Sequence, residues 1–322
     1  MPSYFDASIR AEGLEKRFKD KVAVAQLDLE IRRGEIFGLI GPDGAGKTTT
    51  IRLLAAVMHP SAGRAWVEGL DIVTQAEALR HIIGYMPQRF SLYGDLSVRE
   101  NLDFFADVFH VRGRERQERI ERLLAFARLG EFQSRRAAHL SGGMQKKLAL
   151  ACALIHRPRV LFLDEPTTGV DPISRREFWD LLSELHLQGV TLFVSTPYMD
   201  EAERCTRIGL MHQGRLIELG DPTQIRQLVP GELLAIWTAD ARRARRAVEL
   251  LEGVLETQMY GDLLHVFVDN CARRRPAIEA ALHQAGVAVF DLRPSQPRIE
   301  EAFIWLIRHR REEPEASKAS HD

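Results

Sequence analysis

Residues 41–48 carry the strongest chemical signal in this sequence, because Gly-Pro-Asp-Gly-Ala-Gly-Lys-Thr fits the phosphate-loop pattern G-x-x-x-x-G-K-[ST]. Glycines let successive backbone N–H groups turn toward phosphate oxygens, and the following helix N-terminus adds its positive dipole end. The expected phosphate-binding residues are Gly41, Pro42, Asp43, Gly44, Ala45, Gly46, Lys47, Thr48 and Thr49. Lys47 is expected to reach the outer phosphates as a catalytic cation, and the Thr48 hydroxyl to bind Mg²⁺. The alternative is a glycine-rich turn without a ligand. An apolar strand before the loop and a helix after it favour a nucleoside triphosphate site.

Two adjacent acids, Asp164 and Glu165, follow the apolar strand at residues 160–163. A buried parallel strand normally ends in a turn residue, so two carboxylates at its C-terminal end indicate a site. We expect Asp164 to hold the Mg²⁺ shell and Glu165 to polarise the attacking water. The alternative is a solvated strand end, which would be preferred if the phosphate loop were absent.

A second helix N-terminus with anion-binding character lies at residues 140–145, Leu-Ser-Gly-Gly-Met-Gln, before the apolar helix 148–155. Ser141, Gly142 and Gly143 are expected to offer backbone N–H groups to a phosphate. The alternative for Ser141 is an ordinary helix cap.

The elements that position these motifs alternate between strands and helices. Residues 27–32 alternate in polarity as a half-buried strand does, and residues 98–156 have mainly helical spacing. Fully apolar strands are expected at 36–40, 160–163, 190–194 and 208–211, with a helix that opens at Pro172. This order predicts a doubly wound parallel sheet with a helical insertion and a small antiparallel layer beside it.

After about residue 228 the pattern changes to strand, helix, strand, strand, helix, strand and a closing helix. That order predicts a ferredoxin-like arrangement, with Gly261-Asp262 as the hairpin turn. We therefore expect domains at residues 1–228 and 229–311, and a polar, disordered tail at 312–322. Arginine runs at 242–246 and 273–275 are expected to be solvated helix faces, with nucleic acid or anionic lipid contact as the alternative.

Composition excludes several classes of protein. The 322 residues include 44 basic and 45 acidic side chains, and a net charge of −1 argues against a general nucleic-acid binder. Three cysteines without a CxxC pair support neither a disulfide framework nor a zinc site. Neither a secretory signal nor a stretch long enough to cross a bilayer is expected, so any membrane role should come through a partner.

Taken in order, these motifs resemble the ATP-binding cassette family over about residues 8–228. The resemblance implies an α/β fold, a P-loop NTPase core of the cassette type with an antiparallel layer and a helical insertion, plus the small ferredoxin-like α+β domain. It implies ATP and Mg²⁺ as cofactors, with each ATP held between one cassette's phosphate loop and the LSGG segment of a second cassette. By resemblance, Gln88 touches Mg²⁺ and the attacking water, and Asp171 lies at the dimer interface. Phe18 stands where the family stacks an aromatic ring on adenine; a core position is the alternative.

The sequences of residues 85–102 and of the LSGGMQ segment resemble those of the exporter branch that handles drugs and related solutes. In that branch, the groove after Gln88 receives a cytoplasmic helix of an integral-membrane permease subunit. Phe90, Leu92 and Tyr93 are candidates for that contact, and packing against the helical insertion is the alternative. The implied protein is the ATP-binding motor subunit of an exporter, attached to the cytoplasmic face of the inner membrane.

One position departs from the family pattern. Where the family has Ser-Thr-His, this chain has Ser195, Thr196 and Pro197, and proline lacks both a side-chain donor and a backbone N–H. Losing one charge-assisted bond to phosphate costs roughly 1.5–3 kcal/mol, which slows hydrolysis about ten- to more than a hundredfold.

Because LSGGM is complete, we expect a heterodimer with a second, histidine-containing cassette in preference to a homodimer. The alternative function is a nearly non-hydrolysing regulatory cassette that completes that partner's active site. A cassette of DNA maintenance or translation is disfavoured, because only 52 residues separate Gln88 from Ser141 and the chain carries one cassette.

Overall fold

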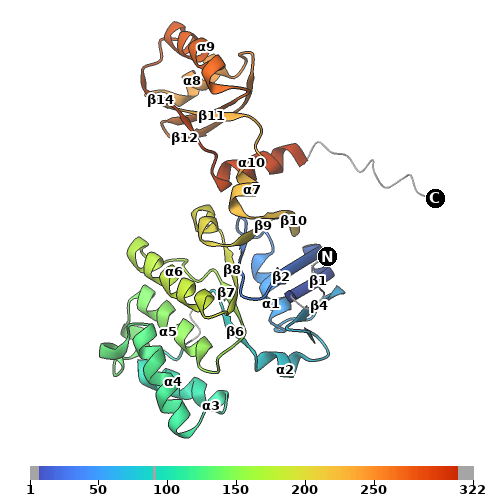
Figure 1. The fold of residues 1–322 in the computed structure, drawn as a ribbon, viewed down its shortest axis with the longest axis vertical. Coiled ribbons are helices and arrows are strands. Elements are labelled where there is room, and N and C mark those ends of the chain that lie inside the picture. The colour runs from blue at the N-terminus through green and yellow to red at the C-terminus, as the bar shows by residue number, and fades with distance from the viewer. Residues whose placement is uncertain (1–6, 90–91, 311–322) are drawn as a thin grey trace, which may run out of the picture. The chain divides into compact units, whose positions relative to one another are not determined.

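The computed structural model describes residues 7–89 and 92–310. These residues form one unit that ends at Asp221 and another that begins at Pro222. Each unit has its own sheets and helices (Figure 1). In the described part of the chain, no helix is both long enough and apolar enough to span a membrane.

A six-stranded sheet forms the centre of the first unit, in the order β10-β9-β3-β8-β7-β6. Its strands are β3 (Ile36–Ile40), β6 (Ile83–Met86), β7 (Val160–Asp164), β8 (Thr191–Thr196), β9 (Arg207–His212) and β10 (Arg215–Gly220). All neighbours pair in parallel except β10, which runs antiparallel to β9. Strands β3 and β7 are buried throughout, which explains why both are apolar except for Asp164 at the end of β7. The predicted parallel sheet is confirmed.

The expected antiparallel layer is present as a second sheet in the order β2-β1-β4-β5. It consists of β1 (Ala7–Phe18), β2 (Lys21–Arg32), β4 (Ala62–Val67) and β5 (Leu70–Asp71), and α2 (Ala76–Arg80) follows it. Helix α1 (Lys47–Leu54) contacts strands of both sheets. Its buried Ile51 and Leu54 share one core with Leu27 and Phe37, so packing fixes the helix that follows the phosphate loop.

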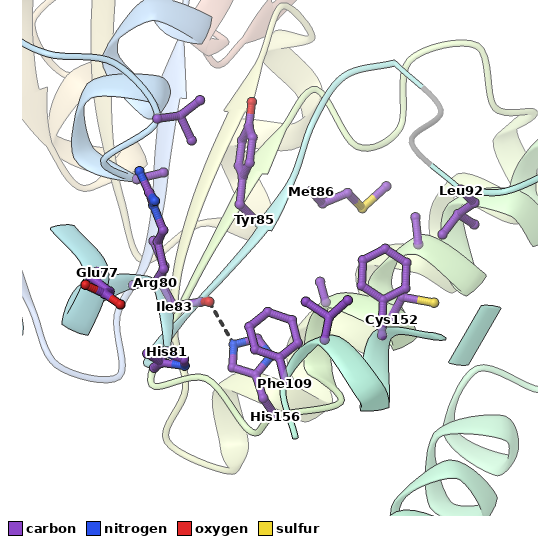
Figure 2. A pocket seen from close by; sticks show the side chains of 16 residues that line it. Glu77, Arg80, His81, Ile83, Tyr85, Met86, Leu92, Phe109, Cys152 and His156 are labelled. Atoms are coloured by element: carbon purple, nitrogen blue, oxygen red, sulfur yellow. Dashed lines mark hydrogen bonds between the residues drawn. The ribbon is translucent and has the colours of Figure 1, made fainter. Parts of the chain in front are cut away.

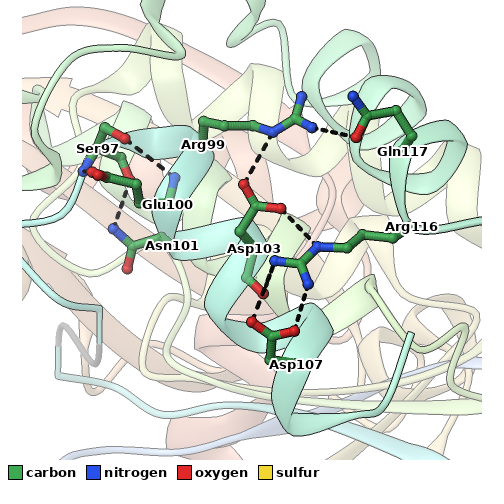
Figure 3. A network of polar contacts seen from close by, with 8 residues as sticks. All are labelled: Ser97, Arg99, Glu100, Asn101, Asp103, Asp107, Arg116 and Gln117. Carbon is green, nitrogen blue, oxygen red and sulfur yellow. Dashed lines mark hydrogen bonds and ion pairs between the residues drawn. The ribbon is translucent and has the colours of Figure 1, made fainter. Parts of the chain in front are cut away.

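The helical insertion is built from α3 (Val98–Val108), α4 (Gly113–Phe126) and α5 (Gly142–Leu154), and it has its own apolar core. Short turns at η1 (Gly130–Phe132) and η2 (Ala137–His139) connect α4 to α5. A polar network joins α3 to α4, because Asp103 accepts from Arg99 at 3.2 Å and from Arg116 at 2.8 Å (Figure 3). Arg116 also pairs with Asp107, one turn further along α3. Two helices pack on the six-stranded sheet next to the insertion. Helix α5 contacts β6, and α6 (Pro172–Leu187) contacts β8.

The second unit has one antiparallel sheet in the order β12-β13-β11-β14, which is the ferredoxin-like order. Its elements are α7 (Pro222–Arg226), β11 (Glu232–Thr238), α8 (Ala241–Val248), β12 (Val254–Tyr260), β13 (Leu263–Val268), α9 (Cys271–Gln284), β14 (Val289–Ser295) and α10 (Ile299–Arg310). Helices α8 and α9 supply Val248 and Ile278 to a core with Leu264 and Val266. The next residue along from Leu264, His265, points to the opposite face, where its Nδ1 lies 2.9 Å from Glu301 Oε1 of α10.

The two units divide at Asp221, seven residues before the boundary expected from the sequence at 228. Helix α7 packs against α10, and it therefore groups with the second unit. The expected tail at residues 312–322 lies outside the described residues.

Candidate functional site

The phosphate loop connects β3 to α1, and its geometry depends on glycine at position 46. Gly46 has a φ of 112°, and a Cβ there would lie 2.4 Å from the carbonyl oxygen of Ala23. Lys47, the first residue of α1, is only 3% exposed. Its Nζ donates to the carbonyls of Gly41 at 2.8 Å and Pro42 at 3.0 Å, so the loop itself holds the ammonium.

Asp164 lies at the end of β7, facing the start of α1. Its Oδ1 accepts from the Thr48 hydroxyl at 3.0 Å and from the Ser195 hydroxyl at 2.7 Å. Its Oδ2 is buried without a hydrogen-bond partner, which is rare for a carboxylate oxygen. A threonine hydroxyl beside a buried carboxylate with a free oxygen is the hard oxygen donor set that suits Mg²⁺, so these residues fit the expected ion.

Glu165 is buried and is the centre of a small polar cluster. Its Oε1 lies 3.5 Å from Lys47 Nζ, while its Oε2 accepts from Gln88 Nε2 at 2.7 Å and from Thr168 Oγ1 at 3.3 Å. Its backbone has a φ of 47°, a left-handed conformation that costs energy outside glycine, so the surrounding contacts hold it there. A carboxylate held beside a lysine and a glutamine amide is equipped to accept a proton from water. The structure thus brings together five sequence-predicted residues: Lys47, Thr48, Gln88, Asp164 and Glu165.

A cavity of about 340 Å³ opens beside the phosphate loop. It is lined by Phe18, Lys21, Ala23, Gly44, Gly46, Lys47, Thr48, Thr49 and Glu165. Phe18 is 45% exposed, and Lys16 Nζ lies 5.3 Å from the centre of its ring. This exposure excludes the core position for Phe18 and leaves its ring at the edge of the cavity.

Ser141 and Asp171 both cap helices. Ser141 Oγ accepts from the backbone of Met144 at 3.3 Å at the start of α5. Asp171 Oδ1 accepts from the backbone N–H of Ser174 at 2.9 Å at the start of α6, and these bonds lower the pKa of its carboxyl. A Cβ on Gly143 would lie 2.5 Å from Ser174 Cβ, so glycine lets the two helix starts approach. Among the described residues, neither cap shares a hydrogen bond with Asp164 or Glu165.

Pro197 is the first residue after β8, at the position where the family pattern has a histidine. The backbone N–H of Tyr198 is donated to the Thr196 hydroxyl at 3.0 Å. The Arg175 guanidinium of α6 lies 4.2 Å from the centre of the Tyr198 ring and 3.8 Å from buried Glu201. The segment is therefore held by α6, while Pro197 itself contributes no donor.

A largely apolar groove of about 400 Å³ lies between β6 and helices α3 and α5 (Figure 2). Leu92 lines this groove, together with Tyr85, Met86, Phe109 and Cys152. The ring of His156 stacks on Phe109 with centroids 3.7 Å apart, and burial lowers the pKa of its imidazole. Tyr93 instead packs edge-on against Phe104 of α3, at 4.5 Å. Phe90, the third candidate for partner contact, lies outside the described residues.

Three residues of the site were not anticipated from the sequence. Ser195 pairs in register with Asp164 across β7 and β8, and this adjacency follows from the strand order of the sheet. Thr168 follows Glu165 by three residues, and a turn places its hydroxyl on the carboxylate. Lys146, whose Nζ donates to the Gln88 carbonyl at 2.9 Å, is one lysine among many on helices and gave no local signal.

Comparison with known proteins agrees with this site. Residues 24–168 match a family model described as ABC transporter. The chain is 42% identical over 307 residues to the "Probable multidrug ABC transporter ATP-binding protein YbhF" of Escherichia coli K12, which covers 94% of this chain and 52% of that protein. The chain therefore spans about half the length of that relative. It is 35% identical over 318 residues to the "Daunorubicin resistance ATP-binding protein DrrA2" of Streptomyces coeruleorubidus, covering 97% of this chain and 99% of the relative.

Solved structures agree in fold over the first unit. The cbiO1 subunit of Clostridium perfringens, part of the ABC transporter complex cbiONQ, aligns with a TM-score of 0.64 and 28% identity, over 68% of this chain and 90% of that chain. The dimeric bacterial ABC transporter cassette MJ0796 aligns with a TM-score of 0.61 and 26% identity, over 66% of this chain and 98% of that chain.

Proposed function

The chain belongs to the ABC transporter family, and from that membership we propose that it is the ATP-binding motor subunit of an exporter. It binds ATP–Mg²⁺ and couples hydrolysis to transport by separate integral-membrane permease subunits. The observation that carries this function is the cluster of Lys47, Gln88 and Glu165 beside the Thr48–Asp164 pair. The names of its relatives, which refer to multidrug transport and daunorubicin resistance, favour an exporter of drug-like solutes.

The phosphate loop, Gly41 to Thr49, surrounds the triphosphate, and Lys47 neutralises its outer oxygens. Thr48, Asp164 and Gln88 would hold Mg²⁺, which supplies charge neutralisation at the phosphates. Glu165 accepts a hydrogen bond from the attacking water and orients it toward the terminal phosphate. Phe18, at the edge of the adjoining cavity, stacks on adenine.

The LSGG segment completes the site of another cassette. Ser141, Gly142 and Gly143 form a helix start whose first two residues are exposed, and it offers backbone N–H groups to the partner's phosphates. Asp171 lies at the same interface. This arrangement requires a dimer, and Pro197 favours a partner that is a different cassette.

Pro197 makes this chain's own site slow. It comes directly after β8 and two residues after Ser195, which bonds Asp164, and it has no group to donate to a terminal phosphate. The second candidate is therefore a nearly non-hydrolysing regulatory cassette, whose main contribution is to complete the partner's site. The two candidates differ only in whether this site turns over.

The apolar groove beside β6 is the proposed docking place for a permease helix. It leads from Leu92 and Phe109 to Tyr85 at the end of the strand that precedes Gln88 (Figure 2). A helix seated there would contact the segment that carries Gln88. This docking would attach the chain to the cytoplasmic face of the inner membrane.

Purified chain tests the proposal. We expect it to bind ATP–Mg²⁺ by titration calorimetry, and Lys47→Ala to abolish that binding as the matched control. Light scattering in ATP should give a monomer, with slow hydrolysis at high protein concentration. A stable homodimer with brisk turnover would refute the asymmetric arrangement, and failure to bind ATP would refute the function itself.

A further inference from the structure

The side chain of Lys146 connects helix α5 to Gln88, a member of the active-site cluster. Lys146 lies five residues after the cap Ser141, is half-buried, and its Nζ donates to the backbone carbonyl of Gln88 at 2.9 Å. Its neighbour Lys147 faces elsewhere and pairs with Glu177 of α6. Of these two adjacent lysines, only Lys146 contacts the site.

The residue that Lys146 holds is the one whose side chain reaches Glu165. Gln88 stands two residues past the end of β6, and its Nε2 donates to Glu165 Oε2 at 2.7 Å. Lys146 thus fixes the main chain of Gln88, and the Gln88 amide fixes one oxygen of the carboxylate. A bond from an ammonium to a carbonyl is charge-assisted and stronger than a neutral one, so it restrains this segment effectively.

The charge of Lys146 lies within electrostatic reach of both acids. Burial lowers the pKa of its ammonium, while Asp164 and Glu165 act in the opposite direction. Lys146 is therefore close to the two carboxylates of the site and is also hydrogen-bonded to Gln88.

We propose that Lys146 is a positioning residue for ATP hydrolysis, holding Gln88 so that its amide orients Glu165. It joins the helix that starts at Ser141, which would meet the partner's nucleotide, to this chain's own water-orienting carboxylate. A shift of α5 then reaches Glu165 through two hydrogen bonds. This inference rests on the proposed ATPase function, and it adds the connection between the two sites.

The experiment compares three variants of the full chain by steady-state ATP hydrolysis at high protein concentration, over a range of ATP concentrations that gives both the rate constant and the KM. Lys146→Met removes the donor with little change in shape, Lys146→Arg keeps a cationic donor, and Lys147→Met removes the neighbouring lysine from the same helix. We expect Lys146→Met to lower the rate constant about tenfold with the KM for ATP unchanged, because the phosphate loop is intact. Lys146→Arg should restore most of the rate. Lys147 is buried and paired with Glu177, so Lys147→Met should lower stability, while the rate constant of the folded chain stays within about twofold of the wild type.

A double-variant cycle separates positioning from general structure. In a Gln88→Ala background the side chain that Lys146 positions is absent, so Lys146→Met should cause no further loss. Additive losses, an unaffected Lys146→Met, or equal losses in Lys147→Met would overturn the proposal.

A second readout does not depend on turnover. Because Gln88 is a proposed Mg²⁺ ligand, Lys146→Met should weaken Mn²⁺ binding to the ATP complex several-fold by electron paramagnetic resonance, whereas Lys147→Met should not. Unchanged Mn²⁺ affinity in a chain that binds ATP without hydrolysing it would also overturn the proposal. A wild-type chain that fails to bind ATP would instead refute the proposed function.

Discussion

Two buried glutamates, one in each unit, show how similar burial serves different ends. Glu165 is 5% exposed in the first unit, and Glu301 is 1% exposed in the second. Glu301 lies on a regular helix, with Oε1 beside His265 and Oε2 accepting from the backbone of Arg298 at 2.7 Å. Glu165 has a left-handed backbone and lies next to Asp164, whose Oδ2 has no partner.

The difference teaches that satisfaction, more than burial, separates a structural acid from a reactive one. Oε2 of Glu301 accepts from the backbone of Arg298 just before α10, and Oε1 lies beside His265 of the sheet, so both oxygens face groups of the second unit. Glu165 has a strained, left-handed backbone, and Oδ2 of the neighbouring Asp164 has no hydrogen-bond partner. Both features are typical of a site that completes its contacts with a ligand. The same substitution should therefore change different properties at the two acids: the rate of hydrolysis at Glu165, and the stability of the second unit at Glu301.

The largest effect is expected for Glu165→Gln, measured in a Pro197→His background where turnover is fast enough to follow. Removing the group that accepts a proton from water should lower steady-state hydrolysis about 10²- to 10⁴-fold, while ATP binding persists. Phosphate release measures the rate, and Glu301→Gln in the same background is the matched control. Equal losses in both variants would remove the distinction between the two acids.

Pro197→His alone should raise hydrolysis about ten- to more than a hundredfold, since it restores one donor near the terminal phosphate. Steady-state phosphate release at high protein concentration measures this gain. Pro197→Ala, which restores a backbone N–H without an imidazole, should gain much less. Brisk hydrolysis by the wild type, with no gain from histidine, would mean that this site works without the imidazole.

Glu301→Gln should destabilise the second unit by about 1–3 kcal/mol, because a buried charged contact with His265 is lost. Burial raises the pKa of Glu301, but His265 and the backbone N–H of Arg298 outweigh it and hold the pKa below the ordinary value of 4.5. The contribution is therefore present above about pH 4.5 and is lost as the pH falls through the lower folded-state pKa.

Urea unfolding across this pH range tests the contribution of Glu301. Wild type and variant should differ at pH 7 and converge under acid, with ATP affinity unchanged. A difference that grows as the pH falls would contradict the assignment.

The smallest effect is expected for Phe18→Ala, which should weaken ATP binding about two- to tenfold through loss of a stacking surface. Titration calorimetry with ATP and with tripolyphosphate distinguishes the base from the phosphates, since only ATP should lose affinity. Phe18→Trp should bind at least as tightly as the wild type. Equal losses for both ligands would place Phe18 outside the base site.

Local spacing was sufficient to name the candidate site residues that are contiguous in sequence. The phosphate loop and the Asp164–Glu165 pair each carry their chemistry within a few residues. Each motif also follows a strand that is recognisable by its apolar sequence. The contacts of Ser195 and Lys146 depend on strand order and helix packing, and those appear only in three dimensions. A sequence of one chain cannot encode them in a local pattern.

Helix α9 shows the same limit in the fold. The sequence pattern predicts this helix over residues 275–284. The helix instead begins one turn earlier, at Cys271, with Pro276 inside it. The Asn270 side chain accepts from Arg273 N at 2.9 Å and stabilises the earlier start.

The polar network between α3 and α4 has a consequence for whatever docks in the apolar groove. Asp103 and Asp107 of α3 are held by Arg116 of α4 (Figure 3). Helix α3 contributes Phe105 to the groove, and Phe109, the residue that follows its last turn, also lines it. Because its ion pairs with α4 restrain helix α3, this side of the groove is preorganised. Little conformational entropy would therefore be lost when a helix binds there. The affinity of the groove then depends mainly on the shape and apolar surface of the incoming helix.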